Sequence, residues 1–403
     1  MSVSRPEEGF AAGSSGYRRV LAVLALGGLA NFALIYFVQP LLPEFARVFG
    51  VEEGATGAAL SATTLAMILG LLMAGPLADH LGRIWVMAGS LILSGALSAL
   101  CAVAPSWEVF LILRAAAGIA LAGLPAIALA YLREKVAASA HAKANAIYIM
   151  GTGLGGAAGR LLPGPLSGLG GWQLVSLVLG VFSVLVGVAV VVLLPGDRPT
   201  RFPFSVLDIA TGTFSLLRSG RIALVCGLGF SSMAVFVGVY NAVSLRLEAE
   251  PFAMSPEQAA MLYLAYPAGL LAPAFSRRLA ERTGRPVAVM LGIAAMAAGA
   301  ALTTPDAVLP ILLGLGLLTF AFFSAHSVAS GWAVDGAHRA GLDTARASSL
   351  YLIFYYAGSS VSGTLSTHIW SGAGWAGVLG MMGLWLALGL ACALALARLP
   401  RRP

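Results

Sequence analysis

The chain repeats its own sequence pattern at an offset of about half its length. Residues 143–148, KANAIY, recur as RASSLY at 346–351, an offset of 203. At an offset of 202, residues 77–83, LADHLGR, recur as LAERTGR at 279–285. Two strongly apolar halves with a common plan indicate a membrane protein built from parallel repeats around a central site.

The composition excludes a water-soluble fold. Of the 403 residues, 59% are hydrophobic and only 10% are charged, and the mean hydropathy is +0.89. A soluble domain carries about 25% charged residues, so this much apolar surface has to face lipid. The 49 glycines agree, because small residues let membrane helices approach closely. We interpret the three cysteines, which have no disulfide or metal-binding spacing, as packing residues: Cys101, Cys226 and Cys392.

Twelve apolar runs are each long enough, at about 20 residues, to span a membrane as a helix. The first six lie at roughly 20–43, 57–78, 85–105, 107–132, 144–166 and 172–194. The other six lie at roughly 222–246, 257–279, 286–304, 307–333, 345–369 and 374–397. The predicted fold is all-α, with twelve transmembrane helices in two pseudo-symmetric six-helix bundles.

The break between the two sets of runs is polar enough to leave the membrane and apolar enough to lie along its surface. We therefore predict five parts in the chain. They are an N-terminal tail at 1–19, a six-helix bundle at 20–194, a linker at 195–221, a second bundle at 222–397 and a C-terminal tail at 398–403. Because no cleavage site follows the first apolar run, we expect the first helix to be retained.

The basic residues predict the orientation of the chain. If the N-terminus is inside the cell, 20 of the 24 Lys and Arg residues fall on the inner side. Arg47 and Arg246 then lie outside, and Arg114 and Arg160 lie within helices. This positive-inside asymmetry predicts that both termini are cytoplasmic, and it explains the net charge of +7 without a nucleic-acid partner. The acidic residues divide into 9 inside and 8 outside, so none is expected within a helix.

Two segments resemble signatures of a known family. Residues 75–83, GPLADHLGR, lie between the second and third predicted helices and resemble the signature loop of the major facilitator superfamily. Residues 111–118, LILRAAAG, resemble the arginine-bearing motif in helix 4 of its proton-coupled antiporter branch. Residues 325–330 and 347–360 are similar to the YnfM type of bacterial inner-membrane transport proteins, which is related to sugar-efflux and drug-efflux carriers. The resemblance covers nearly the whole chain, and it implies a transporter that exports a solute in exchange for protons.

The chain departs from the antiporter pattern in the fifth predicted helix. That branch usually carries a Gly-Pro pair, whereas this chain has Gly156 at the place of the proline. Gly151, Gly155 and Gly159 still form a smooth strip for close helix packing. The bend at proline, and proton antiport as far as it depends on this motif, are therefore not implied.

Asp79 and Arg83 lie four residues apart in the signature loop and are candidates for a cytoplasmic gate. A carboxylate there can lie against the positive N-terminal end of a neighbouring helix, or pair with a basic residue such as Arg133. Such contacts would hold the cytoplasmic side closed in one state and release it in the other. The alternative is that both are ordinary charged loop residues. We expect Asp79→Ala to impair transport without preventing folding.

Two arginines are predicted within helices. Arg114 lies about seven residues from the outer end of the fourth helix, which is about 10 Å deep. A charge at that depth needs helix carbonyls, side-chain oxygens, water or an anionic substrate as a partner, so we take Arg114 as a candidate substrate contact. The alternative is a structural arginine bonded to the first helix. Arg160 lies near the outer end of the fifth helix, where extension toward the lipid headgroups would explain it. The alternative for Arg160 is a binding role.

Polar and aromatic residues on several helices are candidates for the central site. Asn31 and Gln39 share a face of the first helix, and the offset of 202 relates Gln39 to Asn241 on the seventh. Tyrosines form an amphipathic wall suited to sugar rings or aromatic compounds. Each tyrosine has the alternative of being a packing or interface residue. The predicted substrate-binding residues are Asn31, Gln39, Arg114, Tyr240, Asn241, Tyr263, Tyr266 and Tyr355.

His326, near the middle of the tenth helix, is the candidate for proton coupling, because histidine exchanges a proton near neutral pH. The alternative is a neutral histidine bonded to a neighbouring backbone or serine. No metal site is expected, since no MxxxM or HxxxM pair occurs in a helix, and no cofactor is expected. The chain has no GxxxxGK[ST] loop and no catalytic domain, so an enzyme or ATP-driven pump is not predicted.

These expectations combine into a secondary transporter in a bacterial inner membrane that works by alternating access. A positive, tyrosine-lined cavity suits a neutral or anionic compound such as a sugar or organic acid, exported in exchange for protons. A second hypothesis is a proton-coupled multidrug exporter of lipophilic compounds, with Asp79 and His326 serving the protons. A third is a non-transporting membrane receptor. The expected partners are the solute, protons and the lipid bilayer, and a monomer would contain the whole pathway.

Overall fold

The computed structural model describes residues 9–197 and 206–399, and nearly all of them are helical. The other residues, which hold parts of the predicted tails and linker, lie outside the described residues. The first half of the chain forms α1 (Ser15–Tyr36), the 3-10 helix η1 (Gln39–Leu41), α2 (Leu42–Phe49), α3 (Glu53–Thr56), α4 (Ala58–Leu81), α5 (Arg83–Cys101), α6 (Trp107–Leu121), α7 (Gly123–Lys135), η2 (Ala138–Ala140), α8 (His141–Leu161) and α9 (Pro163–Leu193). After α10 (Val206–Phe214) and η3 (Ser215–Arg218), the second half forms α11 (Gly220–Glu248), α12 (Pro256–Ala260), η4 (Met261–Leu271), α13 (Ala272–Thr283), α14 (Arg285–Leu302), α15 (Val308–Arg339) and α16 (Thr344–Arg398).

The all-α prediction is confirmed, and helices lie at each of the twelve predicted places. Within the described residues, ten segments are long and apolar enough to cross a membrane. One of these, α16, covers two predicted spans, which meet at a non-helical Gly374. The predicted fifth span corresponds to α8, which is less apolar because it carries Lys143, Asn145 and several glycines.

The repeat seen in the sequence is also present in the backbone. Gly82 and Gly284, 202 residues apart, both have a positive φ, of 97° and 86°. They turn the chain between α4 and α5 and between α13 and α14. Gly171 and Gly374, 203 residues apart, have φ of 65° and 60° and kink α9 and α16. Glycine adopts positive φ without steric cost, so the sequence keeps it at equivalent turns of the two halves.

Glycines also set the closest helix packing in each half. A side chain added at Gly155 or Gly159 of α8 would collide with the α1 backbone at Leu29 or Ala33. In the second half, Gly358 of α16 lies in the same way against the α11 backbone at Phe230. The predicted glycine strip is therefore a packing surface, and α8 is a continuous helix through Gly156.

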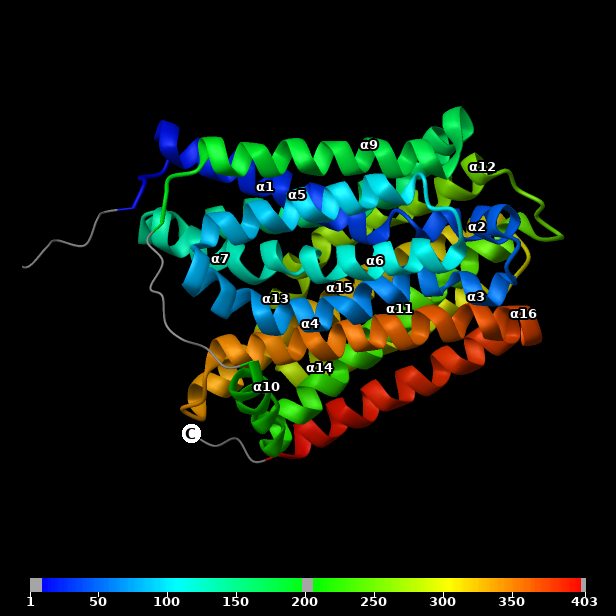
Figure 1. Cartoon of the computed structure of the whole chain (residues 1–403). Helices are drawn as coiled ribbons and strands as arrows, with labels where there is room; N and C mark the ends of the chain where they lie inside the picture. Colours follow the sequence, from blue (N-terminus) through cyan, green and yellow to red (C-terminus); the bar gives the residue numbers. More distant parts are fainter. Residues whose placement is uncertain (1–8, 198–205, 400–403) are drawn as a thin grey trace, which may run out of the picture.

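The long helices run side by side between two ends of the molecule (Figure 1). We call the end where α1 begins and α16 finishes, on the left of the figure, the termini end. The opposite end, with α2, α3 and α12, is the far end. At the termini end, α10 of the linker packs against α4 and the start of α16, with Gly212 next to the Arg346 guanidinium.

Candidate functional site

The first helix changes course at a proline near the far end. Pro40 has no N–H group, and its ring would collide with the carbonyl of Tyr36 in a continuing α-helix. The α-helix accordingly ends at Tyr36, and the chain continues as the short 3-10 helix that begins at Gln39. This turn places Gln39 toward the second half of the chain.

Gln39 and Asn241, which the offset of 202 relates, meet directly. The Gln39 Nε2 donates to Asn241 Oδ1 at 2.6 Å, and both side chains are fully buried. Asn241 Nδ2 in turn donates to the carbonyl of Gly363 on α16 at 3.0 Å. The two predicted site residues therefore bond to one another and join η1 to α11 in this conformation.

Further contacts close the far end between the two halves. Ser61 on α4 and Ser360 on α16 each donate a hydroxyl to the other's backbone carbonyl, at 2.7 and 2.9 Å. Thr367 donates to the carbonyl of Gly54 at 2.7 Å. Of the ion pairs between two described residues, the one that joins the halves also lies here: Arg47 Nη1 to Glu248 Oε2, 2.8 Å.

Arg114 is fully buried in α6, with all three of its nitrogens on backbone carbonyls. Nη1 donates to Leu34 at 3.0 Å, Nη2 to Ile35 at 3.1 Å and Nε to Ala59 at 3.4 Å. The last carbonyls of a helix lack intrahelical donors and form the negative end of its dipole. Arg114 thus caps the end of α1, as expected of a structural arginine bonded to the first helix. Its substrate contact stays a prediction.

Asn31 lies on a face of α1 that is turned into the first half. Gly27, one turn earlier on that face, lies against Leu124 of α7 and Leu91 of α5. The Asn31 side chain is fully buried, and neither of its amide atoms has a hydrogen-bond partner among the described residues. Its role in substrate binding also stays a prediction.

Arg160 lies at the seam between the two halves and is fully buried, so the expectation that it extends toward headgroups is wrong. Gly156, one turn earlier on the same face of α8, lies against the Tyr266 ring of η4, so this face is turned toward the second half of the chain. Its guanidinium carbon lies 3.9 Å from the ring centre of Tyr36 on α1 and 4.6 Å from that of Tyr266 on η4. On α11, Tyr240 and Phe236 lie 5.5 and 5.7 Å away.

Two of the predicted tyrosines of the second half, Tyr240 and Tyr266, contact this guanidinium, and Tyr263 packs next to them. Tyr240 and Tyr263 are stacked with ring centres 5.4 Å apart, and the Tyr240 hydroxyl lies 2.7 Å from Thr319 Oγ1. Tyr266 meets Phe323 edge to face at 5.6 Å. The structure therefore brings Tyr240, Tyr263 and Tyr266 together.

His326 continues the same aromatic cluster toward α16. Its Nδ1 lies 2.9 Å from the Tyr351 hydroxyl, and its ring centre is 4.8 Å from that of Tyr355. Phe322 stacks on His326 at 5.8 Å and on Phe236 at 4.1 Å. A chain of ring contacts thus connects the candidate proton carrier with the surroundings of Arg160.

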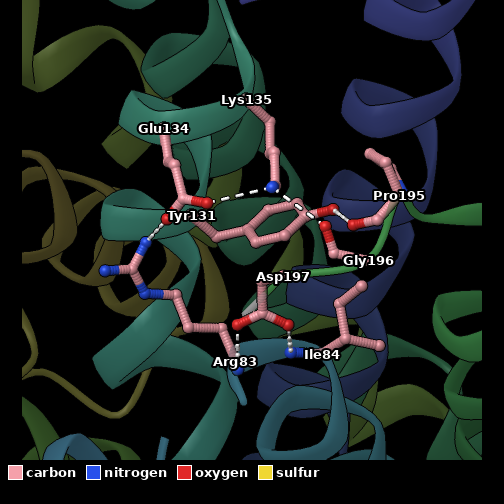
Figure 2. A network of polar contacts seen from close by, with 8 residues as sticks. All are labelled: Arg83, Ile84, Tyr131, Glu134, Lys135, Pro195, Gly196 and Asp197. Carbon is pink, nitrogen blue, oxygen red and sulfur yellow. Dashed lines mark hydrogen bonds and ion pairs between the residues drawn. The ribbon is translucent and has the colours of Figure 1, made fainter. Parts of the chain in front are cut away.

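At the termini end, the signature loop belongs to a polar network that Figure 2 shows. The Asp197 carboxylate, just after α9, accepts from the backbone N–H groups of Arg83 and Ile84 at the start of α5. The Arg83 side chain pairs with Glu134, which also pairs with Lys135 at 2.9 Å. The carboxylate at this helix start is therefore Asp197, and the gate role of Asp79 stays a prediction.

The network continues to the first residues after α9. The Tyr131 hydroxyl donates to the carbonyl of Pro195 at 2.7 Å, and Lys135 Nζ donates to that of Gly196 at 3.0 Å (Figure 2). In the second half, the equivalent Arg285 pairs with Asp335. A cavity of about 530 Å³ beside it is lined by α13 and α15 residues, among them Ser276 and Ser327, whose hydroxyl oxygens are 2.8 Å apart.

Sequence reasoning passed over the residues that matter most at both ends. Tyr36, Glu134 and Asp197 were not singled out, and for Arg160 a binding role was only the alternative to the membrane surface. The signal for Arg160 was Gly156, which lies four residues earlier and therefore on the same helix face. Within the described ranges, no three His, Cys, Asp or Glu side chains are grouped so that they could hold a metal ion.

Comparison with known proteins gives the family. Residues 24–361 match the model of the Major Facilitator Superfamily. The chain is 34% identical over 394 residues to the MFS-type transporter YybF of Bacillus subtilis strain 168, covering 97% of this chain and 96% of that protein. It is 35% identical over 393 residues to the inner membrane transport protein YnfM of Escherichia coli K12, covering 96% and 93%.

A solved structure has the same fold. The nucleoside transporter NupG superposes with a TM-score of 0.73 at 15% identity, over 94% of this chain and 100% of that one. These similarities agree with the buried seam, the repeated glycine turns and the signature loop. The chain is therefore a member of the major facilitator superfamily, a multi-pass membrane transporter and not an enzyme.

Proposed function

We propose that this protein is a secondary active carrier that exports a small neutral or anionic organic compound, a sugar or an organic acid, in exchange for protons. The observation that carries the proposal is the charge of the seam. Arg160 is buried where the halves meet, and none of the ion pairs between described residues includes it. A cationic solute would face an uncompensated positive charge there.

The distribution of the ion pairs supports alternating access. The pair Arg47–Glu248 holds the far end together across the halves. At the termini end, the pairs of Arg83 and Arg285 each stay within one half of the described chain. We propose that the bundles at 20–194 and 222–397, joined by the linker at 195–221, rock against each other and open the two ends in turn.

We further propose that the termini end is cytoplasmic and that the carrier lies in the bacterial inner membrane as a monomer. The concentration of Lys and Arg at this end supports the orientation. The name of the relative YnfM, an inner membrane transport protein, supports the location. The proposed gate, Asp79 with Arg83, then works on the cytoplasmic side.

For the solute we propose a site at the seam, walled by Tyr240, Tyr263, Tyr266 and Tyr355. Gln39 and Asn241 close it at the far end, where they bond to one another at 2.6 Å. Proton coupling is assigned to His326, which adjoins Tyr355. Asn31 and Arg114 remain candidates for solute contact, although their present surroundings are those of structural residues.

The aromatic cluster favours one alternative, a proton-coupled multidrug exporter of lipophilic compounds. Rings from Tyr263 through Phe236 and Phe322 to Tyr355 form a continuous apolar surface. Such a surface suits flat lipophilic compounds as well as sugar rings. The charge of Arg160 is what makes us place a neutral or anionic solute first.

The test is transport by the purified protein in liposomes with an imposed pH gradient. Labelled arabinose, gluconate and benzoate are compared with the lipophilic cation tetraphenylphosphonium. We expect the pH gradient to drive flux of a sugar or an organic acid and not of the cation. Flux of the cation alone would replace the proposal with the multidrug exporter. Binding of any of these compounds without flux would indicate a receptor.

A further inference from the structure

We propose that Arg160 is the residue that binds the solute's charge, and that the solute is an organic acid whose carboxylate it holds. This inference rests on the proposed function and narrows it, from a neutral or anionic compound to an anion. It also assigns the charge to a residue on α8, in place of Arg114 on α6.

The guanidinium of Arg160 has hydrogen-bonding capacity that the described residues leave unused. Nη1 donates to the carbonyl of Gly156 in its own helix at 2.8 Å. Nε and Nη2 are buried and have no hydrogen-bond partner among the described residues. An arginine offers its donors in a planar fork that matches the two oxygens of a carboxylate. The unused nitrogens, Nε and Nη2, are the pair that such a fork presents from one edge.

The surroundings of Arg160 compensate its charge only in part. The four rings around it supply cation–π attraction, which offsets part of the cost of burying the guanidinium charge. Ring contacts do not replace the ion pair that a buried charge needs. The two half-buried acidic side chains Glu248 and Glu44 of the far end are engaged elsewhere: Glu248 pairs with Arg47, and Glu44 accepts from the backbone N–H of Trp172 at 3.0 Å. No ion pair between described residues includes Arg160, so its charge is left for an anion that the protein binds.

Arg114 provides the contrast within the same molecule. It is equally buried, but its three nitrogens all donate to backbone carbonyls. All three nitrogens of Arg114 thus have backbone partners, whereas Arg160 has one backbone hydrogen bond and its ring contacts.

The origin of the four rings connects anion binding to the conformational change. Tyr36 belongs to the first half, and Tyr240, Tyr266 and Phe236 belong to the second. An organic acid whose carboxylate is bound to Arg160 would have these rings around the rest of the molecule. Closure of the two halves around the solute would therefore also complete the binding site. Aromatic and sugar acids both have flat or ring-shaped bodies that suit such walls.

The first test needs no ligand. Arg160→Met, Arg114→Met and the exposed-surface variant Arg282→Met are purified in detergent, and the unfolding midpoint Tm is measured without added carboxylate. Replacing an unpaired buried charge with an apolar side chain of similar length stabilises a protein, at the expense of function. We expect Arg160→Met to raise Tm, Arg114→Met to lower it and Arg282→Met to leave it unchanged. A fall in Arg160→Met as large as that in Arg114→Met would show a structural arginine and overturn the inference.

The second test varies only the charge of the ligand. Benzoate, benzamide and benzylamine share one ring, and gluconate, glucose and glucosamine share a sugar frame. We expect the anion of at least one series to stabilise the wild type, and its affinity to fall at least about tenfold in Arg160→Gln, since a hydrogen bond to a charged group is lost. The inference would be overturned if the neutral or cationic member, or sodium chloride at the same concentration, stabilised the wild type as much as the anion does. It would also be overturned if the anion stabilised Arg160→Gln as much as the wild type. If neither series shifts Tm, the comparison of the methionine variants alone decides whether the inference holds.

The two proposals can fail separately. Transport of a neutral sugar that is unchanged in Arg160→Gln would leave the carrier in place and remove the anion site. Binding of the acid to Arg160 without flux in liposomes would keep the anion site and remove the carrier, since the site would then belong to a receptor. Flux of an organic acid that disappears in Arg160→Gln supports both.

Discussion

At the scale of the residue, His326 has a setting that makes its proposed proton role testable. One ring nitrogen lies 2.9 Å from the Tyr351 hydroxyl, and Tyr355 packs against the ring at 4.8 Å. These are the titratable groups that the described contacts place around it. The hydroxyl can accept from the protonated ring or donate to the neutral one, so the bond tolerates both protonation states.

We predict that His326→Ala removes the pH dependence of transport while solute binding is retained. Tyr351→Phe deletes the bonding hydroxyl and keeps the ring, so it should shift the pH profile without abolishing it. Both are measured as initial flux into liposomes across a pH series, with binding followed by Tm. A pH profile of His326→Ala that matches the wild type would assign the proton to another residue.

The two buried arginines show what sequence could predict at this scale. The spacing of the apolar runs predicted that each arginine lies in a helix and that no acidic residue lies at the same depth. Which one keeps guanidinium nitrogens without hydrogen-bond partners was not predictable, because the answer depends on Pro40. That proline ends α1 and leaves carbonyls for Arg114 to cap. Likewise, the four rings that surround Arg160 come from three elements far apart in the chain, α1, α11 and η4.

At the scale of the element, helices were predictable and their ends less so. Apolar runs predicted a helix at every site, since each run has to satisfy its backbone within the membrane. The ends depend on single residues and on contacts between distant segments. The chain between α9 and α10 is an example, because Asp197 is held at the start of α5. No local pattern around Asp197 indicates that contact.

The glycine strip of α8 leads to a prediction about packing. A methyl group at Gly155 would collide with the α1 backbone at Leu29, which cannot move without displacing the helix. At Gly153, on the same helix, it would meet only the end of the Leu270 side chain, at 2.8 Å. We expect Gly155→Ala to cost about 1–3 kcal/mol by overpacking, and Gly153→Ala to cost little.

The measurement is folded yield and Tm for the two alanine variants. Gly358→Ala serves as a second case, because it lies against the α11 backbone at Phe230 in the repeated half. It should be destabilised as strongly as Gly155→Ala. Equal Tm for Gly153→Ala and Gly155→Ala would mean that the helices separate easily and that the strip does not set their distance.

At the scale of the whole molecule, the repeat accounts for how one chain makes both sides of its seam. Equivalent residues of the two halves meet at the far end, as Gln39 and Asn241 do. Arg47 and Glu248, 201 residues apart, do the same with opposite charges. Because these contacts join the halves at one end, their strength sets how readily that end opens.

We predict that reversing one charge of this pair favours the state in which the far end is open. Arg47 is 56% exposed and Glu248 10% exposed, so the pair contributes no more than about 1 kcal/mol. A shift of about that size changes the ratio of two conformations roughly fivefold, which matters because they differ by only a few kcal/mol.

Ser360→Cys, placed in the seam, reports opening of the far end by its rate of thiol labelling. Labelling should be faster in Glu248→Arg and return toward the original rate in the double reversal with Arg47→Glu, and the difference should shrink at high salt. Equal rates in all three backgrounds would mean that the uncharged contacts hold the far end without help from the ion pair; in these variants they are Gln39–Asn241 and the bond from the Ser61 hydroxyl to the Ser360 carbonyl.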